Sequence, residues 1–177
     1  PVMTVTGQYY LYLPAGNGRG DSTGFYRSTP QVTLTVPSTA AKVITVGAYD
    51  PVYDTYADFS GRGYADSTRT IGVAAAGLTK PDLVAPGVNI QAPDVYGTFT
   101  PTTGTSFATP IVSGAAALLM EWGIVRGNDP FLYGEKIKAY LRKGARPLRG
   151  EREYPNDRVG YGRLCVTDSL PQTGTME

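Results

Sequence analysis

The 177-residue chain is long enough to form one compact domain with a sizeable core. Its 16 basic and 15 acidic residues give a formal net charge of +1, which does not indicate nucleic acid or an acidic membrane surface as a partner. The one cysteine, Cys165, excludes an internal disulfide. We expect no membrane partner, because no apolar run of membrane length is evident.

The first part of the chain is predicted to consist of short strands and loops. Residues 2–13 combine alternating apolar and polar residues with a tyrosine-rich run, which favours an antiparallel strand with one solvent-exposed face. Residues 14–30 are rich in glycine and proline and are predicted to be a loop. Residues 31–36 (QVTLTV) alternate and predict a second strand. Residues 43–48 (VITVGA) are apolar and β-branched, which is typical of a buried strand in a parallel sheet.

The middle of the chain is polar before it becomes apolar again. Residues 50–66 carry several aspartates, but aspartates in turns usually bond their own backbone, so we expect no metal site there. Residues 71–76 are predicted to be a hairpin strand.

The C-terminal part is predicted to be helical. An apolar run that Ser106 begins should form a helix to about Trp122, buried on nearly all sides and ended by Gly123. Residues 133–143 predict an amphipathic surface helix closed by Gly144, with its basic side chains in solvent. A charged surface loop over residues 145–160 and a short helix near residues 164–169 complete the prediction.

Ser106 is the candidate functional residue, because a polar, glycine-flanked turn delivers it to the start of an apolar helix. Backbone N–H groups there lack intrahelical partners, so an oxyanion formed by attack of this hydroxyl would meet hydrogen-bond donors. Ser106 is therefore a candidate nucleophile. The alternative is that Ser106 caps a buried helix, as serine often does.

Two motifs resemble those of the subtilisin-like serine proteases. Residues 104–110 (GTSFATP) resemble the nucleophile motif of that family, and residues 80–90 (KPDLVAPGVNI) resemble the segment that precedes it. Many members have a histidine after the motif proline, where this chain has Ile111, but that histidine is not the catalytic base. The resemblance implies an α/β fold, a parallel-sheet sandwich, and a Ser/His/Asp triad in which Ser106 is the nucleophile.

The chain contains no histidine, although a serine hydrolase of this type needs a general base beside its nucleophile. The opening residues (PVM) are not a translation start. We therefore expect the chain to be the C-terminal piece of a bacterial protease, with the catalytic aspartate and histidine on an N-terminal piece that acts as its partner.

Several segments of the chain, which also include residues 35–37 and 168–171, resemble the clostridial germination-protease subgroup, in which a jelly-roll domain interrupts the catalytic domain. Residues 12–14 (YLP), 43–49 and 160–165 (GYGRLC) carry this likeness. It implies that residues 1–35 end an inserted antiparallel β-domain. Residues 36–170 would then be the C-terminal part of the catalytic domain, and residues 171–177 a tail.

Two further positions follow from the resemblance. Residues 15–17 (AGN) echo a family sequence in which the asparagine amide is the second oxyanion donor, but they also suit a turn. If residues 1–35 belong to the inserted domain, Asn17 is not that donor. Counting back from residues 43–48, Pro37 falls where the family has a proline after a cis bond, so we predict a cis Val36–Pro37 bond.

These observations predict a serine endopeptidase that acts on peptides or proteins and uses no metal or cofactor. The alternative is a pseudoprotease that binds or signals without catalysis, since members of this subgroup lose triad residues. A self-standing structural domain is disfavoured, because half of a parallel sheet would expose apolar edges and faces.

Overall fold

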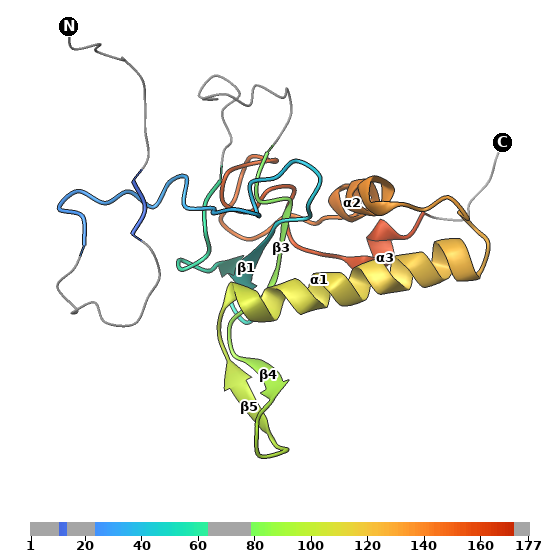
Figure 1. The fold of residues 1–177 in the computed structure, drawn as a ribbon, viewed down its shortest axis with the longest axis horizontal. Helices are drawn as coiled ribbons and strands as arrows, with labels where there is room; N and C mark the ends of the chain where they lie inside the picture. Colours follow the sequence, from blue (N-terminus) through green and yellow to red (C-terminus); the bar gives the residue numbers. More distant parts are fainter. Residues whose placement is uncertain (1–10, 14–23, 64–78, 172–177) are drawn as a thin grey trace, which may run out of the picture.

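A computed structural model describes residues 11–13, 24–63 and 79–171 of the chain. Within these ranges a small sheet of order β2-β1-β3 lies at the centre (Figure 1), formed by β1 (Val46–Asp50), β2 (Thr55–Tyr56) and β3 (Leu83–Pro86). Strands β1 and β3 are parallel, with Val46 opposite Leu83, whereas β2 is antiparallel to β1. The predicted α/β class and parallel strand are confirmed, although the strand begins three residues later than the pattern indicated.

A second, two-stranded sheet stands apart from the first. Strands β4 (Ile90–Pro93) and β5 (Phe99–Thr102) pair antiparallel and project beside the start of α1 (Figure 1). At the tip, Val95 and Tyr96 are exposed. Strand β5 leads almost directly into α1, so this hairpin flanks the helix end that carries Ser106.

Helix α1 (Thr105–Met120) crosses one face of the central sheet and continues as a π-helical turn, η1 (Glu121–Val125). Its buried residues are small or branched and pack toward β1 and β3: Ala108, Val112, Ala115 and Leu119. The predicted end at Gly123 is wrong, since the helical chain continues to Val125. Gly123 is a close-packing position instead, because a Cβ there would lie 2.7 Å from Leu132 Cδ2.

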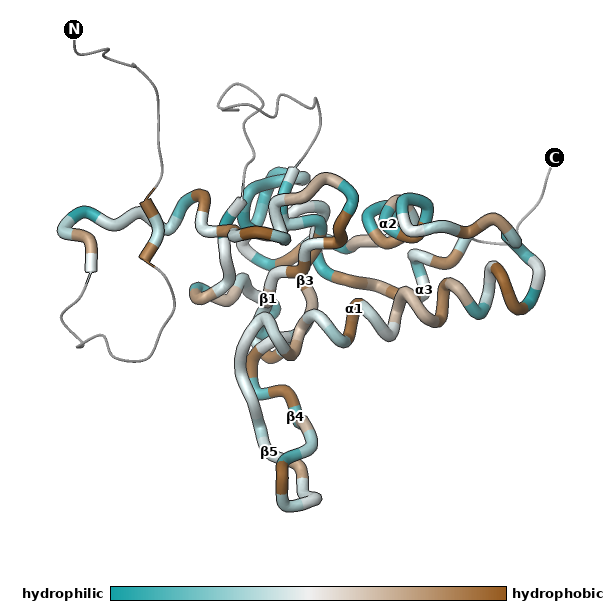
Figure 2. The backbone as a smooth tube through the Cα atoms, in the orientation of Figure 1, coloured by the Kyte–Doolittle hydropathy of each residue, from teal (hydrophilic) through white to brown (hydrophobic). Residues whose placement is uncertain are grey.

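Outside the stripe that faces the sheet, much of the surface of α1 is not covered by described residues, contrary to the prediction of burial on nearly all sides. Leu118 is 52% exposed and Met120 is 44% exposed. Figure 2 shows apolar positions along the whole helix. The expectation of no membrane-length run is also wrong, because Thr105–Val125 spans 21 residues with a mean hydropathy of 1.4. By length and composition this segment would reach across a membrane, but its buried face packs on the sheet as a core helix does.

Helices α2 (Gly134–Lys143) and α3 (Val166–Ser169) pack against one another, and α2 ends at Gly144 as predicted. The predicted solvent-exposed basic face of α2 is wrong in part. Lys138 is buried and Arg142 is half-buried, and both bind the carboxylate of Asp82. The amphipathic pattern gave no sign of this because the partner lies 60 residues away from Arg142 in sequence.

Asp82 is the centre of a buried ionic cluster that comprises Lys80, Asp82, Lys138 and Arg142. The Lys80 Nζ lies 2.9 Å from Asp82 Oδ2 and the Lys138 Nζ lies 3.1 Å from Oδ1. Both ammonium groups also donate to the carbonyl of Val43, and the N–H of Thr45 donates to Asp82 Oδ2 at 2.6 Å. The cluster therefore joins α2, the start of β3 and the segment that enters β1.

The segment before β1 differs from its predicted form. Residues 31–36 form no strand: Val32 has a φ of +57°, and the N–H groups of Thr33 and Leu34 both donate to the single carbonyl of Arg62. The predicted cis Val36–Pro37 bond is confirmed. Residues 11–13 have no regular structure, and the rest of the predicted strand 2–13 and the predicted strand 71–76 lie outside the described residues.

Candidate active site

Ser106 is the second residue of α1 and is exposed. Its hydroxyl makes no hydrogen bond to any residue that the structure describes. A free hydroxyl at an exposed helix start is available to attack an approaching electrophile.

The capping hypothesis for Ser106 is wrong, because the N-cap of α1 is Gly104, and no side chain caps the helix. Gly104 has a φ of +154°, a conformation that L side chains rarely adopt, and so a glycine is required immediately before the helix. Phe107 N–H bonds to the Gly104 carbonyl at 3.1 Å. The N–H groups of Thr105 and Ser106 have no partner within the described part of the chain, so they remain available to an oxyanion.

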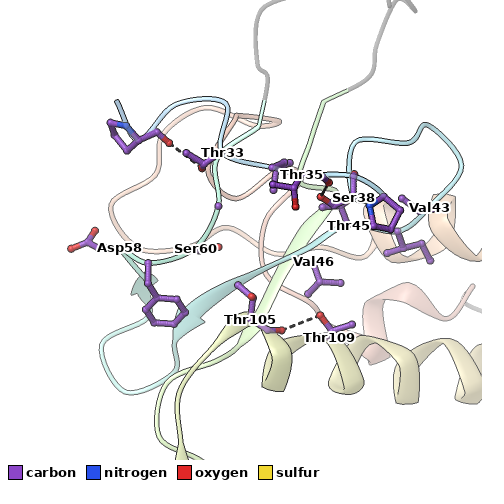
Figure 3. Close-up of a pocket in the computed structure, with 16 residues that line it drawn as sticks. Thr33, Thr35, Ser38, Val43, Thr45, Val46, Asp58, Ser60, Thr105 and Thr109 are labelled. Atoms are coloured by element: carbon purple, nitrogen blue, oxygen red, sulfur yellow. Dashed lines mark hydrogen bonds between the residues drawn. The ribbon is translucent and has the colours of Figure 1, made fainter. Parts of the chain in front are cut away.

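A cavity of about 640 Å³ opens beside the first turns of α1 (Figure 3). Thr105 and Thr109, one helical turn apart, form one wall, where the Thr109 hydroxyl donates to the Thr105 carbonyl at 3.0 Å. The remaining walls come from Pro30 and from residues 33–38, 43–46 and 58–61, and the lining mixes hydroxyl groups and apolar side chains with one carboxylate, Asp58. The cavity therefore borders Thr105, the residue before Ser106, and its lining is polar as well as apolar.

No general base is hydrogen-bonded to Ser106 in the part of the chain that the structure describes. The chain has no histidine, and both lysines of the buried cluster are committed to Asp82. Over residues 11–13, 24–63 and 79–171, no group of three or more His, Cys, Asp or Glu side chains could hold a metal ion. Within the described residues, Ser106 thus has a free hydroxyl beside unpaired N–H groups, and no base is hydrogen-bonded to it.

The hairpin of β4 and β5 contains one carboxylate, Asp94, whose pKa is shifted. The Thr98 hydroxyl, followed by the N–H groups of Thr98 and Tyr96, lowers the pKa of Asp94 below its usual value of 3.8 by hydrogen bonding to the charged form. These contacts close the turn between β4 and β5. Asp94 is therefore a turn residue rather than a candidate base.

The sequence made Ser106 a candidate nucleophile but did not indicate which residues lie around it. Thr105 and Thr109 belong to the same motif as Ser106. Their spacing of four residues could have predicted that they lie on one face of the helix. The walls formed by residues 33–38 and 58–61 carry no local signal, because only the fold brings them to α1. Asn17, the second candidate oxyanion donor, lies outside the described residues.

Comparison with known proteins gives a consistent result. The model of the subtilase family matches residues 10–162. The serine protease AprX of Bacillus subtilis is 32% identical over 179 aligned residues, which cover 90% of this chain and 34% of that protein. Subtilisin BL of Lederbergia lenta is 35% identical over 115 residues, which cover 65% of this chain and 35% of that protein.

Solved structures agree with these relatives. The CspB protease of Clostridium perfringens superposes with a TM-score of 0.74 at 45% identity, over 83% of this chain and 29% of that one. The self-cleaved protease domain of PatA gives a TM-score of 0.56 at 32% identity, over 76% of this chain and 42% of that one. The chain thus spans about a third of the length of AprX and of Subtilisin BL.

Proposed function

The chain belongs to the subtilase family of serine proteases, and from this premise we propose that Ser106 is the nucleophile of a serine endopeptidase. In this reaction the Ser106 Oγ adds to the carbonyl carbon of a peptide bond while its proton passes to a general base. The oxyanion accepts hydrogen bonds from backbone N–H groups at the start of α1. The amine leaves with the proton from the base, and water then hydrolyses the acyl-enzyme.

One observation carries this proposal. Ser106 is exposed at the second position of α1, behind the glycine that sets the turn, with free N–H groups at the same helix end. A serine kept for capping or packing would bond the backbone or face the core. Ser106 does neither within the described part of the chain, whereas Ser113, two turns later, donates to the Thr109 carbonyl at 3.2 Å.

The base and its orienting carboxylate would come from an N-terminal piece of the same protease, which remains associated with this chain. Three observations support this partner. The chain has no histidine, it covers only about a third of AprX, and the described part of the chain leaves apolar residues on both flanks of α1 exposed. Leu118 and Met120, on the two flanks of the buried stripe of α1, offer surface that a covering layer would bury, at about 25 cal/mol per Å² of apolar area.

The substrate would be a peptide or protein chain bound across the start of α1. The cavity beside Thr105 and Thr109 would take a side chain close to the scissile bond. Its lining of hydroxyl and apolar groups includes the carboxylate of Asp58, which would disfavour an acidic side chain through like-charge repulsion. No cofactor or metal enters this mechanism.

The proposal is tested with a biotinylated fluorophosphonate and the protein that includes its N-terminal region. We expect covalent labelling, mapped by mass spectrometry to the peptide that contains Ser106, and its loss in Ser106→Ala. Ser113→Ala is the matched control, since it removes a second hydroxyl from α1 and should leave labelling intact. Labelling that persists in Ser106→Ala would refute the assignment.

A pseudoprotease remains the second candidate, favoured by the absence of histidine from the chain. It predicts that the protein with its N-terminal region binds a peptide but labels no serine and hydrolyses no peptide bond. The same labelling experiment therefore separates the two functions.

A further inference from the structure

Gly87 connects the central sheet to the start of α1. Its N–H donates to the Tyr49 carbonyl of β1 at 3.0 Å, and its carbonyl accepts the N–H of Gly104 at 2.8 Å. A second hydrogen bond joins the same two segments, from the Asn89 N–H to Thr103 Oγ1 at 3.1 Å. Because Gly104 is the N-cap of α1, these bonds fix the height of the helix end, and of Ser106, above the sheet.

No side chain fits at this position. A Cβ on Gly87 would lie 2.6 Å from the Cβ of Ala48, 3.1 Å from the Gly104 carbonyl oxygen and 3.5 Å from the Cβ of Ala108. Carbon atoms in contact prefer about 3.5–4.0 Å, so a methyl group would force β1 away from the Gly87 backbone by about 1 Å. The φ of Gly87 is not positive, so packing and not backbone conformation demands the glycine.

We propose that Gly87 is a positioning residue for Ser106. By allowing β1, the end of β3 and the start of α1 to meet without a side chain between them, it holds the Ser106 hydroxyl and N–H in one place. The reaction is sensitive to this placement, since a misplacement of about 1 Å can cost about 10²-fold in rate. This inference rests on the proposed function, because it concerns the geometry of the same nucleophile.

The test compares Gly87→Ala with a designed rescue in the protein that includes its N-terminal region. Ala48→Gly removes the methyl group that lies 2.6 Å from the added Cβ, so Ala48→Gly/Gly87→Ala should relieve the main clash. Ala48→Gly alone is the reference for the double variant. Gly134→Ala is the matched control, because a Cβ there meets nothing within 4 Å in the described structure.

We measure the rate of Ser106 labelling per folded molecule, together with kcat and KM for a peptide substrate. We expect Gly87→Ala to lower the labelling rate and kcat about 10²-fold while KM changes only a few-fold. In the double variant the labelling rate and kcat should be at least about tenfold higher than in Gly87→Ala. In Gly134→Ala both should equal those of the unmodified protein. A merely structural role would lower the folded fraction but leave the rate per folded molecule unchanged.

Two results would overturn the inference: an unchanged labelling rate in Gly87→Ala, or no recovery on adding Ala48→Gly. If the fluorophosphonate labels no serine in the unmodified protein, the proposed function fails. Hydrogen exchange of the Gly104 amide then still tests whether Gly87 positions the start of α1. Exchange at this amide should accelerate in Gly87→Ala and slow again in the double variant. Equal exchange in all three proteins would contradict the proposal independently of activity.

Discussion

The Lys138 ammonium lies 3.1 Å from the Asp82 carboxylate, and the two side chains are only 8% and 0% exposed. Asp82 also binds Lys80 and Arg142, so a single buried carboxylate accompanies three cations. The remaining donors of Lys80 and Lys138 reach backbone carbonyls or the Thr45 hydroxyl. The stability of the sheet and of α2 therefore depends on one acidic group.

Replacement of Asp82 by asparagine should strongly destabilise the protein. Removing one partner from a buried ion pair leaves uncompensated buried charge, which costs about 3–5 kcal/mol in the free energy of unfolding. Urea denaturation of Asp82→Asn, with its N-terminal region present, measures this loss. Asp168→Asn is the control, because Asp168 also pairs with an arginine, Arg146, but near the surface, where the loss should be much smaller. Equal effects of the two substitutions would contradict the role assigned to the cluster.

The pKa of Asp94 should lie below 3.8 and should rise toward that value in Thr98→Val. The Thr98 hydroxyl is the largest cause of the lowered pKa, and valine keeps the shape of the side chain without the donor. A carboxyl whose pKa is lowered by folding stabilises the folded state above its unfolded pKa, and this stabilisation disappears as pH falls through the folded value. Carboxyl NMR titration checks the shift, and an identical pKa in both proteins would refute its cause.

Asn17 tests the domain assignment. If residues 1–35 belong to an inserted β-domain, Asn17→Ala should leave kcat within a few-fold of the unmodified protein. Loss of an oxyanion donor instead costs about 10²–10³-fold in kcat. A loss of that size would assign Asn17 to the oxyanion hole and would move the start of the catalytic domain to residue 10 or earlier, where the family match begins.

The helix that carries Ser106 could be predicted from sequence because its signals are local. Residues 104–110 place Ser106 at a helix start, and the apolar run after it fixes the element. The parallel strand was also found, since a β-branched apolar run of this length is typical of a buried strand.

The errors arose where distant residues decide the structure. Gly123 resembles a helix stop, but it is a glycine because Leu132 packs against it. The basic residues of α2 resemble a solvated face until Asp82 is brought beneath them. Residues 31–36 alternate between polar and apolar side chains as a strand does. The positive φ of Val32 and the sharing of one carbonyl, that of Arg62, by two N–H groups nevertheless prevent regular strand pairing.

The source of the general base is the central question, because Ser106 has no candidate base among the described residues. Fluorophosphonate labelling of residues 1–177 alone, compared with the same residues in the presence of the N-terminal region, addresses it most directly. We predict labelling of Ser106 only in the second preparation, and no peptidase activity from residues 1–177 alone, because a protonated hydroxyl without a base is a poor nucleophile. A folded, cooperatively melting preparation of residues 1–177 that labels at Ser106 and cleaves peptides by itself would contradict this account and would require a base among its own lysines.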